Sequence, residues 1–172
     1  MTHGPVPTTA EGVRRANREL DAQLLAIADS LDEDVQPVGT AVLDPTAEDD
    51  WSAFQVLAHM SEVSSFFAGH LRTWKADPTA TVGRTVEHEG RRAAVARARV
   101  KGLTATDLAE ELRVSFAHLE AALELLGDAD IQATTSNVKY GAEPLSAFLD
   151  RYVLGHKAAH VNQINVLLET GS

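Results

Sequence analysis

Two histidines lie four residues apart in the segment LGHKAAH, residues 154–160, near the carboxyl end of the chain. Positions four apart on an α-helix differ by only about 40° around its axis, so His156 and His160 share one face. Such a pair occurs in metal sites and, more often, as two ordinary helix histidines. It lacks the glutamate that follows the first histidine of zinc proteases, which excludes that class. The pair alone leaves its role open.

A third histidine strengthens the metal interpretation. His59 lies on the apolar stripe of a predicted helix, together with Val56, Val63 and Phe66. Burying three unpaired imidazoles is costly, and one metal ion would satisfy all of them. Three neutral imidazoles suit Zn²⁺, Ni²⁺ or Fe²⁺ and leave coordination positions open for water or substrate, as catalytic sites do. The alternative is that His59 is a satisfied core histidine and the other two lie at a wet helix edge.

The composition excludes several other chemistries. The chain has 172 residues and no cysteine, which excludes disulfides, thiolate ligands and a cysteine nucleophile. We find no glycine pattern for phosphate binding and no G-x-S-x-G element. The formal net charge of −10 argues against nucleic-acid binding. No apolar run is long enough for a membrane span, and the first residues contain no apolar signal segment, so we expect a cytoplasmic protein without a membrane partner.

One segment departs from this acidic average. Residues 84–101 contain six Lys or Arg residues against two Glu, a local net charge of +4. A charge run of this kind is usually a solvated connecting segment. The other interpretation is a rim that attracts an anionic small molecule.

Four long segments have the apolar spacing of amphipathic helices and are expected to position these residues. They run from about 9 to 34, 52 to 76, 105 to 126 and 144 to 170. The long connection at 77–103 contains a short helix, and the β-like runs within 128–143 are too few for a sheet. We therefore predict an all-α fold, a four-helix bundle with a long crossover connection, in which metal and cofactor sites lie between facing helices. Residues 1–172 form a single domain, with 1–8 disordered.

Capping patterns mark the helix ends. Three pairs have the capping-box spacing, namely Thr8 with Glu11, Ser52 with Gln55, and Thr104 with Asp107. Pro144 suits the first turn of the last helix, and Gly127 is expected to stop the third. The first helix should bury one apolar face, made of Val13, Leu20, Leu24, Ile27 and Leu31. Trp51 and Trp74, near the two ends of the second helix, are interpreted as core residues.

Two blocks of the chain resemble the DinB / YfiT superfamily of four-helix bundles. The first is DDWSAFQVLAHMSEV, residues 49–63, with its tryptophan, helix start and histidine. The second is GAEPLSAFLDRYVLGHKAAHVNQINVLL, residues 141–168, where Gln-Ile follows the histidine pair. The resemblance implies that the three histidines bind a divalent metal, Zn²⁺ or Ni²⁺, and that the protein is a homodimer. It also matches Glu62 and Gln163 to recurrent polar positions, where either could orient a ligand imidazole.

The same resemblance implies a range of functions. Relatives include the N-terminal domain of mycothiol-dependent maleylpyruvate isomerase and the bacillithiol transferases. We therefore expect a metal-dependent S-transferase or isomerase that uses a low-molecular-weight thiol such as mycothiol, with that thiol and an electrophile as its small-molecule partners. Residues 84–101 would help to hold an acidic thiol or substrate. The alternatives are a non-catalytic metal-binding protein of the stress or DNA-damage response, and a self-resistance protein against an electrophilic metabolite.

Overall fold

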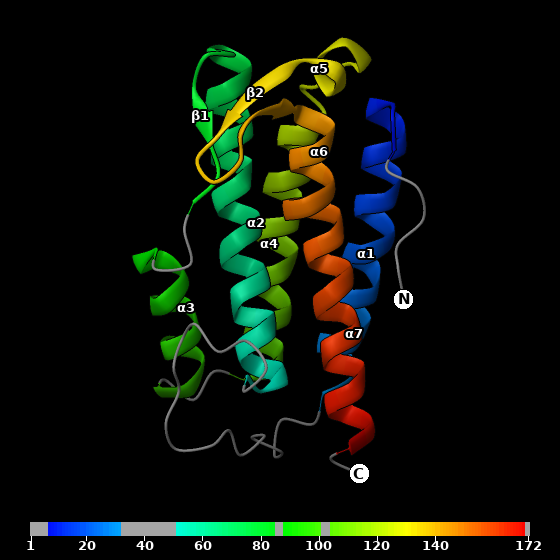
Figure 1. The fold of residues 1–172 in the computed structure, drawn as a ribbon. Helices are drawn as coiled ribbons and strands as arrows, with labels where there is room; N and C mark the ends of the chain where they lie inside the picture. The colour runs from blue at the N-terminus through cyan, green and yellow to red at the C-terminus, as the bar shows by residue number, and fades with distance from the viewer. Residues whose placement is uncertain (1–6, 32–50, 85–87, 101–103, 171–172) are drawn as a thin grey trace.

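The computed structural model describes residues 7–31, 51–84, 88–100 and 104–170, and four long helical stretches form its body (Figure 1). Three of them are α1 (Ala10–Ser30), α2 (Ala53–Ala76) and α4 (Ala105–Leu123). The fourth is a continuous run of α6 (Leu145–Leu149), a π-helical turn η2 (Asp150–Leu154) and α7 (Gly155–Thr170). The predicted all-α four-helix bundle is confirmed.

The connection between α2 and α4 is long because it returns along the bundle before α4 begins (Figure 1). It contains the strand β1 (Thr81–Val82) and the helix α3 (Glu89–Val100). α3 packs against α2 on the outside of the bundle. The short helix predicted within this connection is therefore present, and it lies beside the helix that carries His59.

The prediction that the β-like runs are too few for a sheet is wrong. β2 (Thr134–Asn137) and β3 (Gly141–Pro144) form an antiparallel hairpin, and β1 adds to β2 in parallel, with Thr81 opposite Ser136. The third strand comes from the earlier connection, so inspection of 128–143 alone could not find it. Gly141 has a φ of +72°, a backbone conformation that favours glycine at the end of the turn. The sheet lies across one end of the bundle (Figure 1).

Two of the three predicted capping boxes are confirmed, at the starts of α2 and α4. At α2 the Ser52 Oγ accepts from the Gln55 N–H at 3.4 Å, and the Gln55 Oε1 accepts from the Ser52 N–H at 2.9 Å. At α1 the cap is Thr9, one residue after the predicted Thr8, because its Oγ1 accepts from the Gly12 N–H at 3.1 Å. The predicted box at α1 is therefore wrong, because the cap lies one residue later and Gly12, three residues beyond it, has no side chain to return the bond.

The end of the third helix also differs from the prediction. α4 ends at Leu123, four positions before the expected stop at Gly127, which instead precedes the short helix α5 (Asp128–Gln132). Pro144 is the N-cap of α6 rather than its first helical residue. These shifts move helix boundaries without changing which helices face each other.

The core lies between the four helices, and α2 contributes the most buried residues to it. Trp51 and Trp74 are both 1% exposed, which confirms their interpretation as core residues. The predicted apolar face of α1 also packs into the core. Within the described ranges, no helix combines the length and apolarity needed to cross a bilayer. Most of the segment 1–8, for which we predict disorder, and the last predicted turn of the first helix lie outside those ranges.

Candidate metal centre

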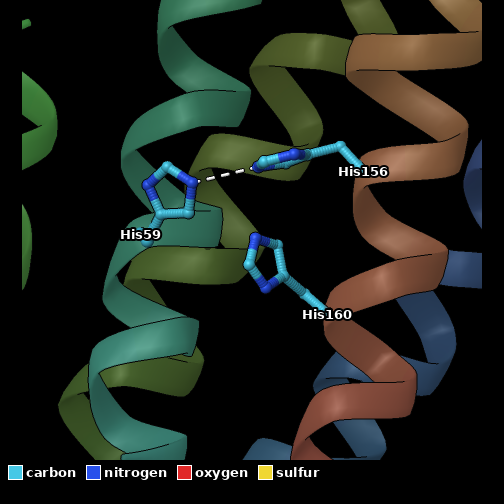
Figure 2. Close-up of side chains that lie close together, drawn as sticks. All are labelled: His59, His156 and His160. Carbon is cyan, nitrogen blue, oxygen red and sulfur yellow. Dashed lines mark hydrogen bonds between the residues drawn. The ribbon is translucent and has the colours of Figure 1, made fainter. Parts of the chain in front are cut away.

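Three histidines from two facing helices meet inside the bundle (Figure 2). α2 carries His59, and α7 carries His156 and His160 one helical turn apart. One ring nitrogen of each histidine lies within 4.8 Å of those of the other two, so the group could hold a metal ion. The structure therefore brings together the three residues that the sequence singled out.

The spacing of the ring nitrogens fits a metal ion. The Nε2 atoms of His59 and His156 lie 3.0 Å apart. Two nitrogens bound tetrahedrally at the usual Zn–N distance are about 3.3 Å from each other. Only a small adjustment of the rings would convert the present contact into shared coordination. The residues present therefore fit a divalent ion held by imidazoles.

Burial and charge favour the neutral, metal-binding form of these imidazoles. His59 is 1% exposed and His160 is 3% exposed, while His156 is only partly buried. Burial lowers the pKa of both His59 and His156 well below 6.5, and nearby positive charges act in the same direction. Both rings are neutral at pH 7 as a result. The cluster has an interior side, made by His59 and His160, and a more open side at His156.

The π-helical turn η2 ends directly before Gly155 and His156. One extra residue in a helix rotates everything that follows by about 100°. The turn therefore helps to decide which face of α7 carries the two histidines toward α2. The apolar spacing predicts one regular α-helix over 144–170, and no feature of that spacing marks the π-helical turn.

Gln163 contacts the outer nitrogen of one candidate ligand. Its Oε1 lies 2.7 Å from the His160 Nδ1, one turn further along α7. An amide oxygen can only accept, so this contact places the proton on Nδ1 and makes Nε2 the His160 nitrogen that could bind a metal ion. The contact is the one expected of a residue that orients a ligand imidazole.

Glu62 lies near His59 but is held by a different partner. Its Oε2 is 3.9 Å from the His59 Nδ1, which is longer than a hydrogen bond. Both carboxylate oxygens instead accept from the Arg84 guanidinium, with a Nη2–Oε2 distance of 2.6 Å. The His59 Nδ1 is buried and has no hydrogen-bond partner among the described residues. Glu62 thus stands beside the ligand ring, and Arg84 sets its position.

The close approach of α3 reinforces this arrangement. A Cβ at Gly90 would lie 3.2 Å from the Glu62 Oε1 and 3.2 Å from the His88 ring, so glycine permits α3 to begin next to Glu62. The His88 Nδ1 accepts from the Gly90 N–H at 3.2 Å and also lies 3.2 Å from the Arg84 Nη1. Arg84, His88 and Glu62 therefore join the crossover connection to α2 at the level of the site.

Trp51 and Arg91 form a wall of the site that the sequence analysis did not identify. The Trp51 ring stacks on His160, with centroids 6.2 Å apart, and meets His59 edge-on at 5.1 Å. The Arg91 guanidinium lies 4.9 Å from the centroid of the Trp51 ring. The signal that could have found Trp51 was its presence in the first resembling block. The position of Arg91 depends on how α3 packs, and no sequence pattern reveals it.

The basic segment 84–101 is not uniformly solvated. The side chain of Arg84 is 8% exposed, and Arg91 is 4% exposed as a residue. The solvated interpretation is wrong for these two residues and correct for the exposed Arg92. The other basic residues of the segment have no described side chain. Two cations of this segment thus lie beside the histidine cluster.

The remaining histidines lie elsewhere. His70 packs on Phe66 with ring centroids 4.2 Å apart, and His118 is exposed on α4. His88 caps α3 as described above, and His3 lies outside the described residues. Among the described residues, the one group of three potential metal ligands is His59, His156 and His160.

A family comparison covers most of the chain. The sequence model of the DinB superfamily matches residues 22–164, a range that includes all three clustered histidines. Comparisons with curated proteins and with solved structures gave no match.

Proposed function

The chain belongs to the DinB superfamily, and from that premise we propose that it is a metal-dependent S-transferase that uses a low-molecular-weight thiol. The proposed metal ligands are His59, His156 and His160, and the proposed ion is Zn²⁺ or Ni²⁺. The thiol is of the mycothiol type, and the second substrate is an electrophilic small molecule.

One observation carries this proposal, the convergence of three imidazoles within 4.8 Å at a point where two of the residues are buried and the third, His156, is partly buried. Three protein ligands leave at least one position for an exogenous ligand, which is the arrangement of catalytic rather than structural sites. Nitrogen donors without any carboxylate ligand suit Zn²⁺ and Ni²⁺ better than Mg²⁺ or Ca²⁺.

The surrounding side chains support a site for an anionic sulfur ligand. A bound divalent ion supplies a Lewis acid that lowers the pKa of a coordinated thiol toward neutrality. Arg91 places a positive charge beside the cluster, which favours thiolate over thiol and attracts acidic substrates, whereas the charge of Arg84 is balanced by Glu62. The buried Trp51 ring packs against His59 and His160, which are themselves buried.

The proposed reaction balances without a further reactant. The sulfur of the thiol forms a bond to an electrophilic carbon. In a substitution the bond to the leaving group breaks and its electron pair departs with that group, and in an addition the π bond breaks and its pair moves to the neighbouring carbon. The thiol proton goes to the leaving group, to the product carbanion or to solvent. In an isomerase, the same addition is followed by elimination, which returns the thiol.

Elemental analysis tests the metal half of the proposal. Untagged protein, purified without chelator and without a nickel column, should carry about one Zn or Ni ion per chain. His156→Ala should lose it, whereas His118→Ala, which changes an exposed helix histidine outside the cluster, should retain it. Wild-type protein without metal, even after reconstitution with Zn²⁺ or Ni²⁺, would refute the proposal.

Turnover assays test the catalytic half. Metal-loaded protein should form thioether products from a panel of electrophiles with mycothiol, bacillithiol or glutathione, and the product should vanish after chelation. If the protein binds metal but forms no metal-dependent product with any of the three thiols, the transferase activity is refuted and only the proposed metal binding is retained.

The burial of His59 and His160 favours a second candidate, a non-catalytic metal-binding protein whose ion stabilises the bundle. This candidate predicts a large fall in the thermal midpoint on chelation and no effect of added thiols on the bound ion. An unchanged midpoint after complete removal of the metal would exclude it.

A further inference from the structure

Lys157 is a buried cation on the helix that carries two of the clustered histidines. It lies between His156 and His160 in the chain and is 2% exposed. Its Nζ donates to the Asp21 Oδ1 and, at 2.7 Å, to the Asn17 Oδ1, both on α1. The ammonium also lies 4.4 Å from the centroid of the Phe116 ring on α4. One side chain of α7 thus binds two helices other than α2.

The residues that receive Lys157 are themselves held in place. Asn17 is 0% exposed, and its Nδ2 donates to the Asp21 Oδ2 at 2.8 Å and to the Glu120 Oε2 at 3.4 Å. Asp21 is 8% exposed. The acceptors of the ammonium are therefore fixed by one hydrogen bond within α1 and one between α1 and α4. Lys157 fits them in one rotational setting of α7.

Stability alone does not explain a buried ion pair. Lys157 is 2% exposed and Asp21 is 8% exposed, so both charged groups lose most of their contact with water. The loss of hydration of both charges therefore offsets much of their attraction, and well-packed apolar residues often stabilise a core equally well. The best-supported role of such groups is to select one register between packed helices.

α7 needs a polar contact of this kind to fix its rotation about its own axis. Its apolar residues are spread around the helix and form almost no apolar face, in contrast to the strong face of α1. Apolar packing alone therefore defines the rotation of α7 poorly. A rotation of α7 by one residue would move His156 and His160 away from His59 and would also break the contacts of Lys157.

We propose that Lys157, held by Asp21 and Asn17, is a positioning residue that fixes the rotation of α7 and so places His156 and His160 against His59. The consequence for metal affinity rests on the proposed function, whereas the consequence for the geometry of the metal-free histidines does not.

The test compares three variants with the wild type. Lys157→Met with Asp21→Leu replaces the ion pair by apolar side chains of similar size and leaves no unpaired charge. Asp21→Asn is a milder change that keeps the acceptor oxygen and removes the negative charge. Arg18→Gln is the matched control, because Arg18 donates to the Glu120 Oε1 at 2.7 Å and so joins α1 to α4 without contacting α7.

Two measurements separate positioning from general stability. The first is Co²⁺ binding, followed by competition with a chelator and by the ligand-field spectrum of the bound ion. The second is the chemical shift of the His160 Cε1–H in metal-free protein, which the ring current of the stacked Trp51 displaces. Thermal unfolding of each metal-free variant shows that it is folded.

The double variant should remain folded, bind Co²⁺ about 10- to 100-fold more weakly and show an altered Co²⁺ spectrum. Its His160 signal should move toward the shift of an unstacked histidine. Arg18→Gln should change none of these readouts. A folded double variant with wild-type Co²⁺ affinity and a wild-type His160 shift would overturn the proposal.

If the double variant fails to fold, Asp21→Asn provides the test. It should show the same changes in Co²⁺ affinity, Co²⁺ spectrum and His160 shift to a smaller extent. An unchanged His160 shift in Asp21→Asn would overturn the inference. If wild-type protein binds no Co²⁺, the proposed function fails, and the His160 shift of the variants still supports or rejects the role of Lys157.

Discussion

His59 and His156 are separated by 97 positions in the chain, yet their Nε2 atoms lie 3.0 Å apart. The contact joins α2, the second long helix in the chain, to α7, the last helix (Figures 1 and 2). An ion held at this point would cross-link two helices that lie far apart along the chain. Its binding free energy would add directly to the free energy of unfolding, because the unfolded chain has no such site.

Gln163→Leu should weaken Zn²⁺ binding by about 10- to 100-fold, because the change removes the acceptor that orients the His160 ring through its Nδ1–H. Gln163→Glu should bind at least as tightly as the wild type, since a carboxylate accepts the same hydrogen bond. Asn162→Leu is the control, an equivalent change at the exposed neighbouring position. Competition with a chromogenic chelator measures all three, and wild-type affinity in Gln163→Leu would show that the 2.7 Å contact does not act on the site.

Glu62→Gln should lower the affinity for Zn²⁺ by roughly tenfold, because it leaves the buried Arg84 cation without its counter-charge near the bound ion. Arg84→Gln should act in the opposite direction, since it releases the carboxylate to accept from the His59 Nδ1–H, 3.9 Å away. Glu110→Gln, on the exposed surface of α4, serves as the control. Dissociation constants that move the same way in Glu62→Gln and Arg84→Gln would reject this assignment of charges.

Sequence reasoning found the histidine cluster because helical spacing and capping are local properties. His156 and His160 share a face at any rotation of α7, and the apolar stripe around His59 requires that ring to point inward. The helices themselves followed from capping boxes and apolar periodicity, with errors of a few residues at their ends. Local sequence patterns thus predicted which three histidines form the cluster and which helices surround it.

The features it missed depend on contacts between distant segments. The pairing of Thr81 with Ser136 cannot be read from either segment alone. A lysine on a helix is normally solvated, so Lys157 gave no sign of its burial against Asp21, 136 positions away. The inward orientation of Arg91 likewise follows from the packing of α3 on α2.

The free energy of unfolding should also depend on pH because His70 is partly buried. Burial lowers its pKa below 6.5, and the positive charges of Arg84 and His88 lower it further. Below pH 6.5 the unfolded chain therefore binds more protons at this position than the folded protein. The contribution of His70 to the free energy of unfolding is thus complete above pH 6.5 and is lost as the pH falls through the folded-state pKa.

An NMR titration of the His70 Cε1–H in metal-free protein measures this shift directly. The midpoint should lie below 6.5 in the folded protein, and Arg84→Gln should raise it, because one of the nearby positive charges is removed. A midpoint at or above 6.5 in the wild type would contradict the burial of this ring against Phe66.

Co²⁺ binding should quench the fluorescence of one of the two tryptophans in the chain. Trp51 lies against His59 and His160, with ring centroids 5.1 and 6.2 Å away, whereas Trp74 lies near the opposite end of α2, on the order of 30 Å along its axis. Quenching by an absorbing ion falls steeply with distance, so Trp74→Phe should retain nearly all of the quenching and Trp51→Phe should lose it. The comparison is made at saturating Co²⁺, because Trp51→Phe also removes the ring stacked on His160 and lowers the affinity. Equal quenching in the two variants would mean that the ion binds away from the three histidines.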